Sequence, residues 1–519
     1  MSSKFNYGGG QLTIGICIDI ANGKTRGVIN NITAERVRAS WREVEKIVHK
    51  QNPVYGINTG FGPLCDTRIS EEDTSLLQIN LLKSHSVGVG KPIPQEIAKL
   101  MLITKVHALA KGYSGISITT LERICWHIDN DMIPVVPEKG SVGASGDLAP
   151  LAHLFLPLIG FGEVYAHGER CPAGNMLKSH GLQPLILGPK EGLALINGTQ
   201  FILAFAVKAV QRLNDALNIA DLVGAMSLEG LMGSARPFDE KPHQLRPYKG
   251  TVHVAKRLFT LLKDSEICNS HANCDRVQDP YSLRCMPQVH GASRNAWLHL
   301  KELTEIELNS VTDNPIIFSA EDTISGGNFH GQPLAIPLDY VTVAAAELGN
   351  IADRRCYLMS EGRYGLPKLL TNNAGLHSGL MIPQYTTAAL VTENKTLCFP
   401  ASADSVPTSL GQEDHVSMGS ISGRKLHQVI DNLEYIQAIE LLYAAQAMDF
   451  RRPLKSTPVI EACYELVREH VTFINEDRVF ADDINRLHQI ITNGMLLATA
   501  NKTANKHHIN LEDDEFGIY

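Results

Sequence analysis

The sequence lacks a long uncharged hydrophobic run and an excess of basic residues. No window of about 18 residues is free of both charged residues and helix breakers, so we expect no membrane-spanning helix. The N-terminus lacks the apolar core of a secretory signal, which leaves the cytoplasm as the expected location. The formal net charge of -8, and the lack of a basic stripe interleaved with aromatic residues, argue against a nucleic-acid partner.

Metal and nucleotide signatures are also missing. The 10 cysteines lack the paired spacings of a disulfide framework or a zinc site, so we expect reduced thiols and no bound metal. The string Gly88-Val-Gly-Lys91 is followed by Pro92 rather than the Ser or Thr of a phosphate-binding loop. A content of 44% hydrophobic and 20% charged residues is that of a soluble globular protein, and 519 residues give a prior of about three domains.

Long stretches with helical periodicity follow residue 200. Residues 201–236 contain no proline, and small or apolar residues recur there at alternating steps of three and four. Similar stripes cover residues 338–360 and the segment between Gly423 and Pro453. Helices this long exceed the mean globular helix roughly two- to threefold. We therefore expect a mostly α protein with an elongated central bundle of long helices, which pack against other subunits.

The first 200 residues predict a smaller mixed α/β region. A strand is predicted by the alternation of Leu12, Ile14, Ile16, Ile18 and Ile20. A hairpin is predicted over residues 163–170, around Gly168. We divide the chain into this mixed region (1–200), the central bundle (201–450) and a helical C-terminal part (451–519). A large helical scaffold without catalysis fits these patterns equally well.

The most informative segment is 140–150, which reads Gly-Ser-Val-Gly-Ala-Ser-Gly-Asp-Leu-Ala-Pro. The nitrogen of Gly146 can attack the carbonyl carbon of Ala144, and loss of water then closes a five-membered imidazolone. Dehydration of Ser145 leaves an exocyclic methylene, a strong electrophile of a kind that ordinary side chains do not provide. The glycines of the segment allow the positive φ angles and close approach that cyclisation needs. A plain small-residue turn is the alternative.

The longer string from Gly140 to His153 resembles the self-cyclising motif of the aromatic amino acid ammonia-lyases. The resemblance implies that Ala144, Ser145 and Gly146 form a 4-methylidene-imidazol-5-one group (MIO). It also implies a mostly α-helical fold like that of fumarase and aspartase, and homotetramers in which three subunits build each active site. Two mechanisms remain open: the substrate amine attacks the electrophile, or the substrate ring attacks it.

Other polar strings match the family in the same order and imply residues around the reacting atoms. Tyr55, which on its own reads as a half-buried hydrogen bonder, matches the base that removes a β-proton. A tyrosine pKa near 10 must be lowered for that task, by positive charge or by a hydrogen bond donated to the phenolate. Asn197, a helix cap in the simpler interpretation, matches the ligand of the substrate carboxylate. The resemblance makes Arg284 the clamp on that carboxylate and places Tyr281 beside the electrophile.

A second set of matching residues surrounds the substrate ring. His85, in Ser84-His85, matches the position that selects the ring, and Phe329 matches an aromatic residue that packs over it. The segment with Met381 and Gln384 is expected to line the same pocket. Tyrosine and phenylalanine lyases typically carry Asn-Gln-Asp where this chain has Gln-Glu-Asp-His with Glu413, the pattern of histidine-specific members. A carboxylate at that place suits an imidazole, because it accepts a ring N–H.

The resemblance thus implies conversion of L-histidine to trans-urocanate and ammonia. The alternatives are a tyrosine ammonia-lyase, a 2,3-aminomutase or a histidine-betaine lyase on the same scaffold, and a catalytically inactive helical protein. Intact Tyr55, Ser145 and Arg284 argue against the inactive protein, and Glu413 argues against the tyrosine enzyme.

Overall fold

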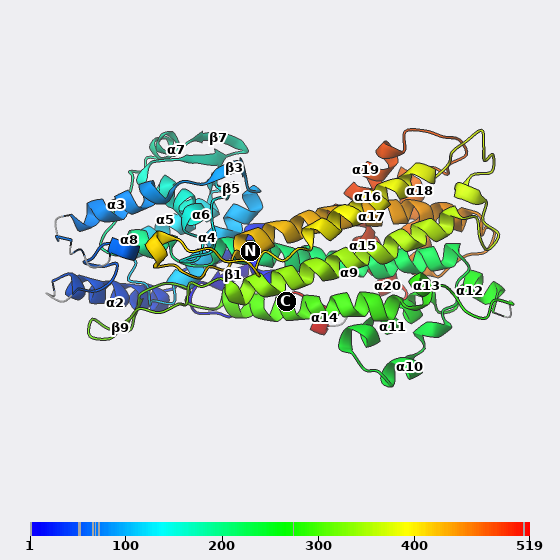
Figure 1. Cartoon of the computed structure of the whole chain (residues 1–519), viewed down its shortest axis with the longest axis horizontal. Helices are drawn as coiled ribbons and strands as arrows, with labels where there is room; N and C mark the ends of the chain where they lie inside the picture. The colour runs from blue at the N-terminus through cyan, green and yellow to red at the C-terminus, as the bar shows by residue number, and fades with distance from the viewer. Residues whose placement is uncertain are drawn as a thin grey trace.

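The computed structural model describes residues 3–49, 53–64, 67, 69–70, 73–272, 275–511 and 514–519. Long helices lie side by side along an elongated bundle, and a smaller mixed region covers one end of it (Figure 1). The long helices are α9 (Gln200–Gly230), α14 (Met286–Leu308), α15 (Gln332–Ser360) and α17 (Gly419–Asp449). The mostly α fold with a long-helix bundle is therefore confirmed.

The boundaries of these helices differ from the prediction at several ends. Helix α9 stops at Gly230 rather than near residue 236, since Met232 takes a positive φ of 50° that a helix does not continue through. Helix α15 begins at Gln332 and carries Pro337 in its second turn, where the missing N–H removes one backbone hydrogen bond. Helix α17 begins at Gly419, five residues before the predicted start after Gly423.

The strand predicted from Leu12 to Ile20 is wrong. Those residues form helix α1 (Ile14–Ala21), and the Thr13 side chain caps it by accepting a hydrogen bond from the Ile16 nitrogen. Nearly every side of this helix is buried, so apolar residues stand on all faces and their alternation carries no information about a strand. The hairpin is confirmed as the antiparallel strands β6 (Glu163–Ala166) and β7 (Glu169–Pro172), joined through Gly168 with a φ of 87°.

The remaining helices are mostly short. They are α2 (Asn31–Val48), α3 (Thr74–His85), α4 (Gln95–Leu109), α5 (Ile118–Asp129), α6 (Leu148–Phe155), α7 (Ala173–Ser179), α8 (Glu191–Ile196), α10 (Glu240–Gln244), α11 (Lys249–Leu262), α12 (Glu266–Ser270), α13 (Tyr281–Arg284), α16 (Met381–Leu397), α18 (Pro458–His470), α19 (Phe480–Thr492) and α20 (Met495–Lys506). None of the helices in the described part of the chain is long and apolar enough to cross a membrane.

The strands form small separate sheets. They are β1 (Ser3–Asn6) with β2 (Thr25–Val28), β3 (Val89–Pro92) with β5 (Pro137–Lys139), β4 (Ile133–Pro134) with β6 (Glu163–Ala166) and β7 (Glu169–Pro172), and β8 (Ile316–Ile317) with β9 (Thr323–Ile324). The β1–β2 pair is parallel and the others are antiparallel. The eight cysteines within the described ranges are all free thiols.

The core consists of two large hydrophobic clusters along the bundle. One packs the N-terminal helices against the first half of α9 and the start of α17, and includes Leu82 and Ile196. The other packs the far halves of α9 and α17 against the C-terminal helices, and includes Leu283 and Leu380. Loops anchored in different clusters therefore lie apart along the bundle. The division at residues 200 and 450 remains a proposal.

Candidate active site

The segment with Ala144-Ser145-Gly146 runs from strand β5 to helix α6, and the start of α17 holds it from one side. The Met418 nitrogen donates to the Val142 carbonyl at 2.9 Å. The Ser420 hydroxyl donates to the Ser141 carbonyl at 2.7 Å. These contacts fix the segment against residues that lie more than 270 positions later in the sequence.

Glycine is required at two positions of this segment. Gly143 and Gly146 have φ angles of 73° and 75°. A Cβ at Gly146 would lie 2.1 Å from the Gly198 carbonyl oxygen, and one at Gly143 would lie 2.2 Å from the Ser417 hydroxyl. The left-handed backbone and the lack of room for a side chain suit the tight backbone fold that cyclisation between Ala144 and Gly146 needs.

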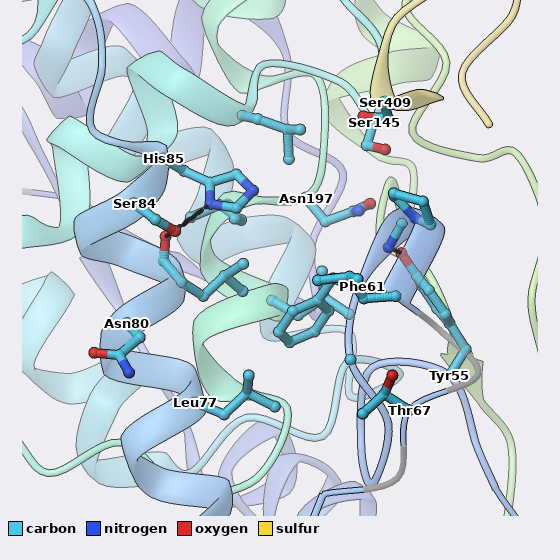
Figure 2. Close-up of a pocket in the computed structure, with 18 of the residues that line it drawn as sticks. Tyr55, Phe61, Thr67, Leu77, Asn80, Ser84, His85, Ser145, Asn197 and Ser409 are labelled. Carbon is cyan, nitrogen blue, oxygen red and sulfur yellow. Dashed lines mark hydrogen bonds between the residues drawn. The ribbon is translucent and has the colours of Figure 1, made fainter. Parts of the chain in front are cut away.

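Two adjoining cavities meet at Ser145. The first has a volume of about 490 Å³ and is lined by Tyr55, His85, Ser145, Asn197 and Glu413, among other residues. The second, of about 590 Å³, shares Tyr55, Ser145 and Glu413 with the first and adds Ala144 and Phe329. In Figure 2, His85 lies on α3 with Leu77 and Asn80, while Asn197 and Tyr55 face the space below Ser145. The fold thus gathers segments separated by more than 350 residues around one serine.

Glu413 is held by three hydroxyl groups. Its Oε1 accepts a hydrogen bond from the Ser145 hydroxyl at 2.8 Å. Its Oε2 accepts hydrogen bonds from the hydroxyls of Thr408 and Ser409, each at 2.9 Å. Thr408 and Ser409 therefore fix the carboxylate so that one oxygen points at Ser145 across the cavity.

His85 is oriented by its own helix. Its Nδ1 lies 2.9 Å from the Leu81 carbonyl oxygen, which can only accept, so Nδ1 carries the proton. Burial lowers the pKa of His85, although the Leu81 carbonyl and the charge of Glu413 act in the opposite direction. The ring is therefore neutral at neutral pH, and its Nε2 has a lone pair that accepts hydrogen bonds.

Tyr55 and Asn197 also take defined positions. The Tyr55 oxygen accepts a hydrogen bond from the Gly62 nitrogen at 3.2 Å, an interaction that stabilises a phenolate. Asn197 follows the last residue of α8 and is 2% exposed, and its side-chain oxygen has no hydrogen-bond partner within the described residues. Thr199, not Asn197, is the N-cap residue of α9, and Asn197 is instead the C-cap residue of α8, so the simpler interpretation of Asn197 as the cap of the long helix is wrong.

Four residues expected at the site lie elsewhere in this chain. Tyr281 and Arg284 form α13, with Tyr281 71% exposed, and the Arg284 Nε donates to the Asp279 carbonyl at 3.0 Å. Met381 begins α16, and the Gln384 amide donates to Asp353 at 3.0 Å. Helices α13 and α16 lie toward the opposite end of the bundle from α3, α6 and α8 (Figure 1). A single chain therefore does not bring these four residues to Ser145.

The sequence interpretation missed the polar residues that support the site. Asp147 is buried, its Oδ2 accepts from the Ile202 nitrogen at 3.0 Å, and burial raises its pKa to about 7. Lys105 is buried on α4, with its Nζ 2.6 Å from the Asn197 carbonyl. The available signal for Lys105 was a lone lysine in the apolar run Leu-Met-Leu-Ile-Thr-Lys-Val. That pattern did not indicate which group Lys105 binds.

Comparison with known proteins agrees with this arrangement. A family model described as aromatic amino acid lyase matches residues 12–469. The chain belongs to the aromatic amino acid lyase family.

Its relatives narrow the class further. A histidine ammonia-lyase from Myxococcus xanthus (strain DK1622) is 47% identical over 492 residues, which cover 94% of this chain and 97% of that protein. The crystal structure of histidine ammonia-lyase from Trypanosoma cruzi matches with a TM-score of 0.90 at 39% identity, covering 99% of this chain and 97% of that one. Tyrosine aminomutase from Streptomyces globisporus matches with a TM-score of 0.92 at 34% identity, covering 99% and 100%. Because one scaffold carries different reactions, the side chains in the cavity must decide the substrate.

Proposed function

We propose that this protein eliminates ammonia from L-histidine to give trans-urocanate. The observation that carries the proposal is the pairing of Glu413 and His85 in the cavity that contains Ser145. A carboxylate and a neutral imidazole both accept hydrogen bonds, and an imidazole substrate donates its ring N–H to one of them, or two ring N–H groups to both when it is protonated. The relatives that are 44–47% identical and are named histidine ammonia-lyase support the same substrate.

We propose further that Ala144, Ser145 and Gly146 form the MIO group. The fit is supported by the positive φ of Gly146, by the lack of space for a Cβ there, and by the exposure of Ser145 to both cavities. The group supplies a methylidene carbon that accepts electrons from the substrate. Dehydration removes the Ser145 oxygen that now donates to Glu413, which leaves the Glu413 Oε1 available to a substrate N–H.

The side chains around Ser145 suggest a division of work. Tyr55 takes the β-proton, and the hydrogen bond from the Gly62 nitrogen favours its phenolate form. The Asn197 amide lines the first cavity, and its NH2 group donates to the substrate carboxylate. His85 and Glu413 hold the ring, while Phe329 closes the second cavity over it. The apolar residues that line the first cavity, such as Leu81 and Leu193, exclude water from the reacting atoms.

We also propose that the protein is a homotetramer whose active sites are shared between subunits, and that it works in the cytoplasm. Support for the sharing comes from Tyr281, Arg284, Met381 and Gln384, which the family pattern requires at the site and which lie toward the far end of the bundle. Exposed apolar residues follow α15 at helical spacing, at Ile336, Tyr340 and Val343. Such a stripe is typical of a helix that packs against another subunit.

Sharing of sites predicts complementation between two inactive variants. Ser145→Ala and Arg284→Ala should each abolish turnover as homo-oligomers. Co-expression in equal amounts should restore roughly a quarter of wild-type activity, because random mixing gives that share of sites with both residues intact. Ammonia release from the purified hybrid measures the recovery. Mixed oligomers with no more activity than the parents would contradict shared sites.

A panel of substrates tests the function itself. The purified protein is incubated separately with L-histidine, L-tyrosine and a histidine betaine, and the conjugated acrylate is followed by ultraviolet absorbance together with the released amine. We expect rapid release of ammonia from L-histidine. Preferred turnover of L-tyrosine, or formation of a β-amino acid without free ammonia, would contradict the proposal.

A further inference from the structure

Lys105 is a completely buried lysine next to the site, and the reaction as proposed does not use it. It stands on α4 and is 1% exposed, and its Nζ donates to the Asn197 carbonyl at 2.6 Å and to the Gln200 side-chain oxygen at 3.4 Å. Burial lowers its pKa to about 7, opposed by Asp313 and Asp147 and assisted by Lys190. Burying an ammonium group is unfavourable, and an apolar side chain of the same length would avoid that cost. The hydrogen bonds that the Lys105 ammonium donates must therefore account for its presence here.

The backbone that Lys105 holds leads directly to the electrophile segment. Gly198 follows Asn197 with a φ of 133°, and its nitrogen donates to the Ser145 carbonyl at 3.4 Å. Its carbonyl accepts from the Asp147 nitrogen at 2.8 Å. A Cβ at Gly198 would lie 2.5 Å from the Gln200 side-chain oxygen, the second partner of Lys105. The carbonyl that Lys105 binds and the nitrogen that donates to the Ser145 carbonyl thus belong to one peptide group, and the carbonyl that accepts from Asp147 belongs to the next.

The same carbonyl belongs to the residue whose amide faces the cavity. Asn197 lines the first cavity, and Figure 2 shows its side chain extending toward Ser145. Its side-chain oxygen has no partner among the described residues, so no hydrogen bond of that oxygen fixes the direction of the amide. The backbone must set that direction. Lys105 is a donor that fixes this backbone from inside the protein.

We propose that Lys105 is a positioning residue that aims the Asn197 amide into the cavity and, through Gly198, holds Ser145 and Asp147 in the conformation that cyclises. This inference rests on the proposed function for the substrate, but the conformation of the electrophile segment can be tested without turnover. The alternative is that Lys105 only caps the C-terminal end of α8, where a cation is favourable.

Lys105→Met removes the donor and keeps an unbranched side chain that is one atom shorter. Three quantities are measured: the mass of the peptide that contains residues 140–150, kcat/KM for L-histidine, and inhibition by urocanate compared with free imidazole. We expect incomplete loss of water from the peptide, a fall in kcat/KM of about 100-fold, and weaker inhibition by urocanate with unchanged inhibition by imidazole. Imidazole lacks the carboxylate that Asn197 is proposed to bind. The comparison therefore separates a misdirected Asn197 amide from a general distortion of the cavity.

Lys190→Met is the matched control. Lys190 is the other completely buried lysine of this region, and it pairs with Asp313 at 2.6 Å and with the Ser114 carbonyl rather than with Asn197. We expect this variant to be less stable, yet to lose two water molecules from the peptide and to keep the wild-type ratio of urocanate to imidazole inhibition. Equal effects of the two substitutions on peptide mass and inhibition would overturn the proposal.

Lys105→Gln is a second variant in case Lys105→Met is insoluble. Its side chain is one atom shorter and uncharged, so it fills the site with a polar group but does not reach the Asn197 carbonyl as Lys105 does. We expect a fall in kcat/KM of at least about tenfold. Complete maturation with wild-type kcat/KM in either variant would overturn the role of Lys105. A wild-type protein that loses two water molecules without acting on L-histidine would refute the substrate and leave the peptide measurement as the test of Lys105.

Discussion

Ser145→Ala should abolish ammonia release from L-histidine, with kcat reduced at least about a thousandfold, while the fold remains intact. Without the Ser145 oxygen and its dehydration no methylidene carbon forms, and no other side chain supplies an equivalent electrophile. The cost in stability is small, because Ser145 lines the two cavities and belongs to neither large hydrophobic cluster. Ammonia release and the melting temperature Tm are measured on the same preparation.

Ser456→Ala is the control for Ser145→Ala. The Ser456 hydroxyl donates to the Glu229 carboxylate at 2.5 Å, so its removal deletes the same kind of serine–carboxylate bond outside both cavities. This variant should keep wild-type kcat and lose about 1 kcal/mol in the free energy of unfolding, the usual contribution of one hydrogen bond. Full activity of Ser145→Ala would end the argument for a backbone-derived electrophile.

Glu413→Gln should lower kcat/KM for L-histidine about 100-fold. In the proposed binding mode the carboxylate of Glu413 accepts the ring N–H in a charge-assisted hydrogen bond. Such bonds contribute about 2 to 3 kcal/mol, which corresponds to a factor of about 100. The amide keeps the volume, and its oxygen still accepts from the hydroxyls of Thr408 and Ser409. Steady-state kinetics with L-histidine measure the effect.

Asp414→Asn is the control for Glu413→Gln. Asp414 is the next residue, is exposed, and lines only the second cavity. Its neutralisation changes the net charge by the same amount but should change kcat/KM by less than about threefold, since exposed charges contribute little. Equal losses in the two variants would mean that a general electrostatic field, not a bond to the ring, sets the preference for histidine.

Much of the site was predictable because its chemistry lies in short strings that break the helical pattern. Tyr55, Ser145, Asn197 and Glu413 were each identified from such a string, and the fold brings all four around one cavity. The long helices were predictable because the period of apolar residues persists over many turns. The strings did not show which site residues come together within one chain. Arg284 and Gln384 match the family equally well, yet their helices lie toward the opposite end of the bundle from Ser145.

The failures have definite physical causes. Helix α1 was mistaken for a strand because a helix buried on all sides has no polar face to reveal its period. The supporting residues Lys105, Lys190 and Asp313 were missed because their partners are backbone carbonyls and distant side chains, which leave no local pattern. A buried charged side chain is stabilised by partners that are close in space, and these partners need not be close in sequence.

The backbone-derived electrophile is tested most directly by the mass of the peptide containing residues 140–150, from wild-type protein purified without substrate. We expect this peptide to be lighter than its sequence by two water molecules, with both losses confined to Ala144, Ser145 and Gly146. A peptide of unmodified mass, with an intact Ser145 hydroxyl in protein that releases ammonia from L-histidine, would contradict this expectation.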